Sequence, residues 1–176
     1  MYYRRAKTPG ACYFFTVNLA ERNKSLLVEN IDNLRSAFKK VKKNHSFTIS
    51  AIVVLPDHLH TIWQLPENDA DYPTRWNLIK RSFSRSLPKT ERISNSRRTK
   101  GERGIWQRRY WEHMIKDEND FAQHVNYIHF NPVKHGYVQS PVDWPYSSIH
   151  QYIRDGILQA DWASALSDGD FGERRV

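Results

Sequence analysis

The pattern that most constrains this chain is a pair of apolar, β-branched runs separated only by the dipeptide Pro56-Asp57. Residues 47–55 and 58–65 are each the length of a strand, so the short break predicts an antiparallel hairpin. The second run opens with His58 and His60. Because side chains alternate across a strand, these two imidazoles point to the same side. The alternate side chains would pack on helices, and the imidazoles would open onto the other face, where a substrate can reach them.

The other periodicities of the chain place this hairpin in a longer series of elements. Apolar and β-branched runs predict strands at residues 11–20, 47–55, 58–65 and 105–115. Apolar residues spaced by three or four predict helices at residues 31–43, 74–87 and 118–130, the last one ended by the Asn131-Pro132 step. The first six elements follow β-α-β-β-α-β, which is the order of a ferredoxin-like α+β sandwich with an antiparallel sheet. The histidine strand would then be interior to the sheet, and the last helix would be appended to it.

Length and composition indicate one domain. The chain has 176 residues, 39% of them hydrophobic, which is enough to bury a substantial core. We expect residues 1–160 to form this domain and residues 161–176 to form a mobile C-terminal tail. No apolar run approaches the roughly 20 residues that cross a bilayer. The single cysteine, Cys12, excludes an internal disulfide and a cysteine-based zinc site, so we expect a cytosolic protein.

Positive charge is concentrated in one part of the chain. The net charge is +8, yet residues 75–109 alone contain twelve basic and two acidic residues. Such a segment attracts a polyanion, most commonly nucleic acid, although a solvated charged surface is the alternative. Six tryptophans and nine tyrosines favour nucleic acid, since unpaired bases stack on aromatic rings. The candidate DNA contacts are Arg75, Lys80, Arg81, Arg85, Trp106, Arg108, Arg109, Trp111 and Lys134.

Within this basic segment, residues 90–104 are polar and almost devoid of apolar side chains. This composition predicts a mobile loop, either an inert linker or a nucleic-acid contact.

Tyr127 is a candidate nucleophile on the last predicted helix. A spacing of three or four residues places it on one side of the helix with Gln123, His124 and Asn131, while apolar residues form the buried side. A phenol with an ordinary pKa of about 10 is a poor nucleophile at neutral pH and needs a metal ion or another positive charge nearby. Taken alone, the tyrosine is more often a half-buried aromatic, and His-x-His is more often an incidental pair.

Five segments in a fixed order carry a resemblance to a known family. They read YFFTVNL (13–19), VVLPDHLH (53–60), WQRRYWEH (106–113), YIHFNPVKHGYV (127–138) and DWPYSS (143–148). With these segments the chain resembles the HUH superfamily of single-tyrosine transposases, and within it the IS200-like, REP-associated tyrosine transposases. The segments span nearly the whole chain, so the resemblance extends to the complete fold.

The resemblance implies a site and a reaction. His58 and His60 would bind Mg²⁺ or Mn²⁺, and Tyr127 would attack single-stranded DNA beside a palindromic, REP-like hairpin through a 5′-phosphotyrosine intermediate. Asn131, one helical turn after the tyrosine, would be the third ligand, with Glu112 and His113 as alternatives. The family implies a bacterial cytoplasmic enzyme, at the nucleoid when it binds DNA, that works as a monomer; a dimer is the alternative.

Two other functions fit parts of the sequence. A domesticated, non-catalytic DNA- or RNA-binding protein would keep the basic surface, but it would be expected to lose His58, His60 or Tyr127. A metal-dependent hydrolase of small molecules would have no use for so basic a segment. The acidic residues after Ala160 also suggest a tail that covers the DNA site and inhibits it, or else a simple chain end.

Overall fold

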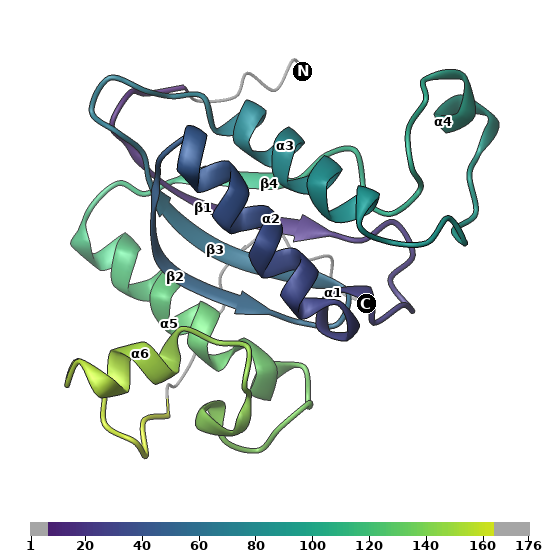
Figure 1. Cartoon of the computed structure of the whole chain (residues 1–176). Coiled ribbons are helices and arrows are strands. Elements are labelled where there is room, and N and C mark those ends of the chain that lie inside the picture. The colour runs from purple at the N-terminus through teal and green to yellow at the C-terminus, as the bar shows by residue number, and fades with distance from the viewer. Residues whose placement is uncertain (1–6, 164–176) are drawn as a thin grey trace, which may run out of the picture.

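One antiparallel sheet of four strands organises the fold, which the computed structural model describes for residues 7–163. The strands are β1 (Cys12–Asn18), β2 (Thr48–Val54), β3 (His58–Gln64) and β4 (Trp111–Met114). The helices are α1 (Leu26–Glu29), α2 (Ile31–Asn44), α3 (Tyr72–Arg85), α4 (Asn95–Thr99), α5 (Glu118–Lys134) and α6 (Ile149–Arg154), with a 3₁₀ turn at Pro141–Asp143. The strands lie in the order β2-β3-β1-β4 (Figure 1). This order and the helices confirm the predicted ferredoxin-like α+β fold.

The predicted hairpin is present, and its second strand lies inside the sheet. The backbone N–H of Leu55 donates to the carbonyl of His58 at 2.9 Å and closes the turn. On β3, His60 pairs with Val53 of β2 on one side and with Thr16 of β1 on the other. Both neighbours are hydrogen-bonded along the strand, so β3 is held from two sides.

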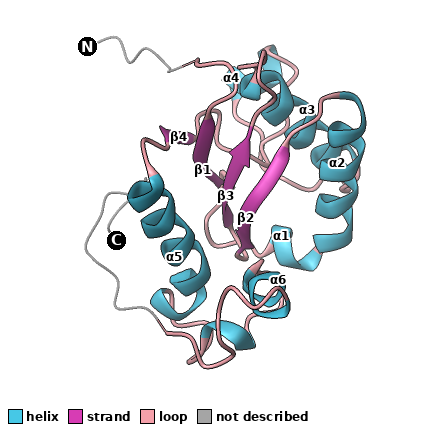
Figure 2. Cartoon of the chain, turned by 90° about the vertical axis from the view of Figure 1, so that its left-hand side faces the viewer, coloured by secondary structure: helices cyan, strands magenta, loops and turns pink. Residues whose placement is uncertain are grey.

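Helices cover both faces of this sheet (Figure 2). On one face, α2 and α3 enclose the larger core, in which Trp63 of β3 stacks on Trp76 of α3 with ring centroids 4.3 Å apart. On the other face lies α5, which packs Val125 and Ile128 against Phe14 and other residues of the sheet. The expectation that the histidine face opens to solvent was therefore wrong. Because α5 is long enough to cross β2 and β3, it covers the strand positions that face away from α2 and α3.

The last predicted helix continues beyond its expected end at residue 130. Pro132 lies inside α5, which extends to Lys134. The helix is terminated by Gly136, whose φ of 72° places it in the left-handed region. The N–H of Gly136 donates to the carbonyl of Val133 at 2.9 Å, and the N–H of Tyr137 to that of Pro132 at 3.0 Å. This is a Schellman end, in which the glycine terminates the helix after the proline has been accommodated.

The predicted fourth strand is much shorter than expected, because only Trp111–Met114 pairs along β1. Residues 105–107 lie antiparallel beside the end of β1, where Trp106 forms an isolated bridge with Leu19. Here Ala20 donates its N–H to the carbonyl of Ile105, and Gln107 donates its N–H to that of Asn18.

The preceding segment, residues 90–104, contains the short helix α4 rather than only a loop. It is held to α3 by the side chain of Arg103, which bonds to Glu91 and to the carbonyls of Ser84 and Pro88. The strands β1, β2 and β3 and the helices α2 and α3 begin and end close to their predicted bounds, whereas α1 and α6 were not predicted.

Most of the predicted tail, from residue 164 onward, and the suggestion that it inhibits DNA binding lie outside the described residues. Within the described part of the chain, no helix is both long and apolar enough to cross a membrane.

Candidate active site

The two histidines of β3 lie under α5 in the interior of the protein. His58 is 1% exposed and His60 is fully buried, and their ring centroids are 5.0 Å apart. They face the same side of the sheet, as alternation along the strand predicted. Since that side is the one covered by α5, the strand and the helix together enclose the pair.

Each histidine is oriented by a neighbour that bonds its Nδ1 atom. Nδ1 of His58 donates to a carboxylate oxygen of Asp57 at 2.7 Å, and Nδ1 of His60 lies 2.8 Å from the hydroxyl of Thr16. Both contacts leave Nε2 as the ring nitrogen that would bind an ion. Carboxylates and hydroxyls behind a histidine have this role in metal sites, where they fix the ring and its tautomer.

Asp57 is itself held as an anion. Burial alone would raise its pKa, but hydrogen bonds from His58 and Arg22 outweigh burial and lower the pKa of Asp57 to about 2. The guanidinium of Arg22 forms an ion pair with the same carboxylate. The aspartate is therefore charged at neutral pH and strengthens the basicity of the imidazole in front of it.

The candidate nucleophile lies directly beside this pair. The ring of Tyr127 packs edge-on against His60, with centroids 5.2 Å apart, and is only 2% exposed. Its phenol oxygen accepts a hydrogen bond from Nζ of Lys134 at 3.1 Å. The polar side of the helix was expected to be separate from its buried side, but His124, Tyr127 and Asn131 of that side are buried as well, whereas Gln123 is exposed. The arrangement can hold a negative charge at the phenol oxygen.

The three candidates for a third ligand lie in different places in the fold. Glu112 of β4 pairs with Phe15 of β1. Because cross-strand partners share a face, the side chain of Glu112 lies on the side of the sheet that α2 and α3 cover. His113 faces α5, but its Nε2 bonds to the carboxylate of Asp120 instead. Asn131 is fully buried on α5, one turn after Tyr127, and can offer an amide oxygen.

Sequence reasoning missed His135 as a neighbour of the site. Its ring lies 5.1 Å from that of His58, at the C-terminal end of α5. No local signal points to this contact, since it depends on α5 continuing past Pro132.

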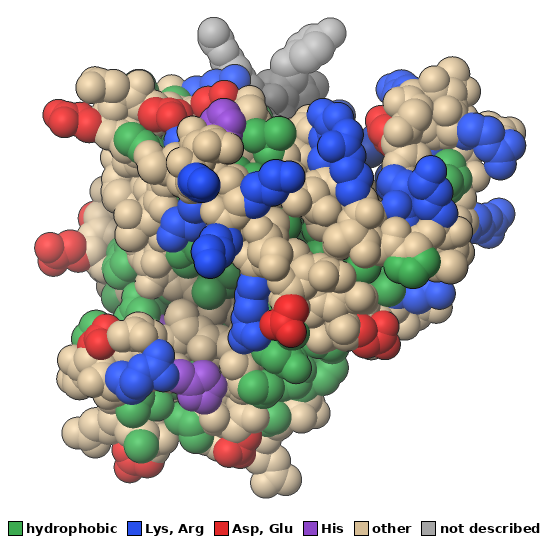
Figure 3. Space-filling model, in the orientation of Figure 1, with side chains coloured by type: hydrophobic (Ala, Val, Ile, Leu, Met, Phe, Trp, Pro, Cys, Tyr) green, Lys and Arg blue, Asp and Glu red, His purple; other side chains and the backbone are tan. Residues whose placement is uncertain are grey.

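A basic groove lies on the α3 side of the molecule. It has a volume of about 740 Å³, and Lys and Arg side chains gather around it, over α3 and the segment near α4 (Figure 3). Its basic lining residues are Lys80, Arg81, Arg85, Arg97, Lys100, Arg103 and Arg108. Two of these form ion pairs within the protein: Arg103 pairs with Glu91, and Arg108 pairs with Glu102. Arg81 and Arg85 are exposed on α3, with their charges directed to solvent.

Two of the predicted DNA contacts are buried instead. Arg75 is 2% exposed, because its guanidinium bonds to Asp69 at 2.7 Å and to the carbonyls of His45, Ser46 and Asp71. Its place in the basic segment suggested a role at the surface, but it ties α3 to the loops on either side.

Trp106 is also buried, at 6% exposure, against Phe83. Its ring belongs to the core and adds only a small exposed surface to the lining of the groove.

The groove reaches the sheet at the end where the histidines lie. Gln107 lines the groove, and its backbone N–H donates to the carbonyl of Asn18 at 3.0 Å. Asn18 is the partner of His58 in the β1–β3 register. The groove and the histidine pair are therefore linked through the end of β1.

The remaining predicted contacts lie outside the groove. Trp111 is half-buried on β4, opposite Thr16 and thus on the histidine side of the sheet. Arg109 and Lys134 are exposed.

Comparison with known proteins identifies the family that the chain resembles. The family described as "Transposase IS200 like" matches residues 10–131. The chain is 43% identical to the REP-associated tyrosine transposase of Escherichia coli K12 over 99% of this chain and 98% of that protein. It is 50% identical to a Haemophilus influenzae protein of the same family name, over 91% of this chain and 92% of the relative.

A solved structure gives the same result at the level of the fold. The structure of a REP-associated tyrosine transposase bound to a REP hairpin superposes with a TM-score of 0.87. Its sequence is 42% identical, and the match covers 100% of this chain and 99% of that one. The predicted resemblance is thereby confirmed, and the chain belongs to the REP-associated tyrosine transposases of the IS200-like family.

Proposed function

We propose that this transposase cuts and rejoins single-stranded DNA beside REP-like hairpins, with Tyr127 as the nucleophile. The observation that carries the proposal is the placement of the tyrosine ring 5.2 Å from His60, with the ammonium group of Lys134 on its oxygen. A structural tyrosine needs neither neighbour. The hairpin as substrate rests on the similar solved structure, which is described as bound to a REP hairpin.

The donor set fits a divalent ion. His58 and His60 offer Nε2 atoms, and Asn131 offers an amide oxygen from the helix above them. Two imidazoles and one neutral oxygen leave room for phosphate oxygens and water, and the oxygen ligands of phosphoryl transfer favour Mg²⁺ or Mn²⁺. When bound, such an ion would polarise the scissile phosphate and neutralise its charge.

The chain's own residues account for the chemical step. The Tyr127 oxygen attacks phosphorus and loses its proton, the bond from phosphorus to the 3′ oxygen breaks, and that oxygen leaves as a hydroxyl after taking up a proton. The product is a tyrosine linked to the 5′ phosphate. Lys134 donates to the tyrosine oxygen and would stabilise the phenolate as it forms, through a charged hydrogen bond. Attack by a 3′ hydroxyl reverses the step, so one site serves cutting and joining.

The groove beside α3 is the proposed binding surface for the hairpin. Arg81 and Arg85 are placed to contact phosphates, which position nucleic acid without reading its sequence. Trp111, on the histidine side, is the aromatic residue best placed to stack on an unpaired base near the scissile bond. The strand would pass between them at the end of β1.

The test is the formation of a covalent adduct. The full-length protein is incubated with a labelled single-stranded REP-like hairpin and Mn²⁺ or Mg²⁺, and the denatured mixture is separated by size. We expect a protein–DNA adduct in the wild type, and none in Tyr127→Phe, which keeps the ring but lacks the oxygen. His58→Gln with His60→Gln should abolish the adduct while hairpin binding persists.

The alternative, a protein that binds DNA without cutting it, makes the opposite prediction. Binding of the hairpin by the wild type without an adduct, across several flanking sequences and both ions, would establish it. An adduct that persists in Tyr127→Phe would refute the assignment of the nucleophile alone.

A further inference from the structure

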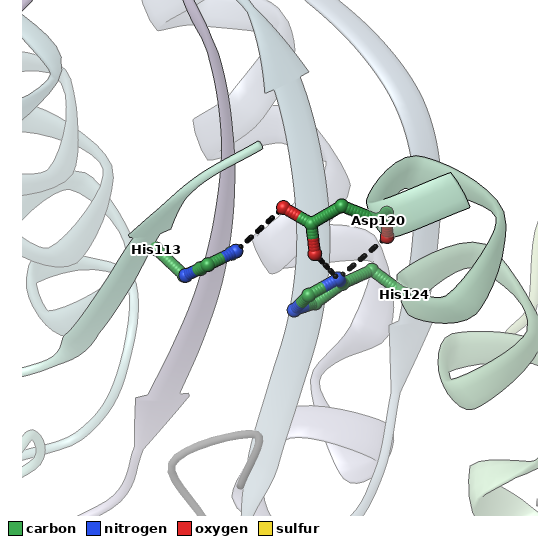
Figure 4. Close-up of side chains that lie close together, drawn as sticks. All are labelled: His113, Asp120 and His124. Atoms are coloured by element: carbon green, nitrogen blue, oxygen red, sulfur yellow. Dashed lines mark hydrogen bonds and ion pairs between the residues drawn. The ribbon is translucent and has the colours of Figure 1, made fainter. Parts of the chain in front are cut away.

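A second cluster of metal-binding side chains lies at the other end of α5. His113 of β4, Asp120 of the first turn of α5 and His124 of the second turn converge, as Figure 4 shows. Nε2 of His113 is 2.8 Å from one carboxylate oxygen of Asp120, and Nδ1 of His124 is 3.0 Å from the other. One candidate ligand atom from each side chain lies within 4.8 Å of the other two.

This cluster is separate from the site of the proposed reaction. The ring of Phe14 stands between them, 4.7 Å from the ring of His124 on one side and 5.6 Å from that of His60 on the other. Neither Tyr127 nor the histidine pair needs the cluster for the chemistry described above. The proposed reaction therefore assigns no role to these three residues.

We propose that His113, Asp120 and His124 form a second cation site, which takes a transition metal of the Zn²⁺ class. Two imidazoles and one carboxylate are a ligand set that suits such ions, and imidazole in particular favours them over Mg²⁺. Ligands bound at about 2.0–2.1 Å in a tetrahedron stand roughly 3.3 Å apart. The two contacts of Asp120, at 2.8 and 3.0 Å, are shorter than that spacing by about 0.3–0.5 Å and involve different carboxylate oxygens, so a small outward shift of the side chains would admit an ion.

The surroundings of the cluster prepare it for an ion. The backbone N–H of Lys116 donates to the Asp120 carboxylate at 2.9 Å and holds it in place. His124 is nearly buried, whereas the side chains of His113 and Asp120 are 27% and 17% exposed, so water can complete the coordination. The ion would take the place of the hydrogen that lies between His113 and the carboxylate, and of the one on Nδ1 of His124, which also lies 2.8 Å from the backbone carbonyl of Asp120.

The nearby cysteine is not part of this site. Among the described residues, the ligand atoms that converge within 4.8 Å of one another come from His113, Asp120 and His124, and Cys12 does not belong to this group. Three protein ligands and one or more waters are therefore expected.

An ion at this position would join two elements that bear on the reaction. It would fasten β4, from which His113 projects, to the beginning of the helix that carries Tyr127. The second site would thus stabilise the placement of the helix without touching DNA. This inference does not depend on the proposed reaction, since it concerns only the binding of the ion.

The experiment measures the binding of Zn²⁺, which is the only metal ion added. Full-length protein is freed of metal with a chelator, and the equivalents of Zn²⁺ bound after dialysis are counted by elemental analysis, with folding checked by circular dichroism. Three proteins are compared: the wild type, His58→Gln with His60→Gln, and the isosteric Asp120→Asn with His124→Gln. Thermal unfolding of each is followed with and without Zn²⁺.

We expect the variant of His58 and His60 to retain one equivalent of Zn²⁺, because its cluster is intact. The cluster variant should bind one equivalent fewer than the wild type. At about 100 times its dissociation constant, Zn²⁺ should raise the unfolding midpoint of the first two proteins by roughly 5–10 °C more than that of the cluster variant.

Two results would overturn the proposal. One is complete loss of Zn²⁺ binding in the variant of His58 and His60, which leaves the cluster unaltered. The other is a full complement of Zn²⁺ in the folded cluster variant, Asp120→Asn with His124→Gln, which has lost two of the three proposed ligands. Neither result depends on whether the protein cuts DNA.

Discussion

The ammonium group of Lys134 donates a hydrogen bond to the phenol oxygen of Tyr127, 3.1 Å away and two turns along α5. The same group lies 4.7 Å from the centre of the tyrosine ring. Lysine and tyrosine seven residues apart meet in this way because α5 continues through Pro132. The helix thus places a positive charge on the atom that is proposed to attack.

Replacing this lysine should slow the reaction more than it weakens DNA binding. In Lys134→Met, which keeps the length of the side chain, we expect the rate of adduct formation to fall roughly 10- to 100-fold, the range that a hydrogen bond to a charged group supplies. Lys134→Arg, which retains the charge, is the matched control and should keep most of the rate. Single-turnover cleavage at saturating hairpin measures both. If Lys134→Met instead lowers only hairpin affinity, the lysine is a phosphate contact.

Charge on the exposed side of α3 should determine hairpin affinity. Arg81→Ala with Arg85→Ala should weaken hairpin binding and reduce the slope of log affinity against log salt by about 2, because two phosphate contacts are lost. The discrimination between hairpin sequences should not change.

The control for charge alone is Lys39→Ala with Lys43→Ala, which removes two exposed cations from α2, away from the groove. Fluorescence anisotropy at several salt concentrations compares the two variants. Equal losses in both would assign the binding to net charge rather than to the groove.

Replacing Arg75 should lower the free energy of unfolding and leave DNA binding unchanged. Arg75→Met removes the partner of Asp69 and leaves the carbonyls of His45 and Ser46 without their donor. The loss in free energy of unfolding should be on the order of 3 kcal/mol, as for other buried ion pairs with one partner removed. Urea unfolding measures it. A variant as stable as the wild type but weaker in DNA binding would contradict the structural role.

The buried imidazole of His129 should make the protein less stable in acid. Burial, and next the charge of His150, lowers the pKa of His129 to about 4, whereas an unfolded histidine has a pKa near 6.5. Between these two values the unfolded chain binds more protons, so stability falls as the pH drops from about 6.5 to about 4 and levels off below. The total loss is roughly 3 kcal/mol.

Two variants test this prediction by urea unfolding over the same pH range. His129→Gln should remove the acid-dependent loss. Ser148→Ala removes the hydroxyl 2.9 Å from the imidazole but leaves the ring buried, so it should lower stability at every pH and keep the slope. A slope unchanged in His129→Gln would show that another group is responsible.

Local rules predicted the hairpin and the histidine pair. A two-residue break between β-rich runs and alternation along a strand are properties of neighbouring residues, so the positions of His58 and His60 could be derived from the sequence. Recognition of the five segments added the family, which the comparisons confirm. The order of elements was sufficient to place β3 inside the sheet.

Contacts between distant segments were harder to predict. Arg75 looked like a surface cation, because no sequence rule shows that its charge is matched by the loop residue Asp69. The burial of most of the polar side of α5 could not be foreseen, because only the tertiary fold shows how the helix lies on the sheet. The rule that a helix ends before proline also failed at Pro132, where the actual end is the glycine-based Schellman turn.

The central strand β1 has two faces with different neighbours. Tyr13, Phe15 and Val17 belong to the core under α2 and α3, whereas Phe14 and Thr16 adjoin His60. A saturation mutagenesis map of this strand should therefore alternate in phenotype from one residue to the next. Substitutions at Tyr13, Phe15 and Val17 should lower the abundance of folded protein. Those at Thr16 should lower cleavage per folded molecule, and those at Phe14, which packs on α5 and also adjoins His60, should lower both.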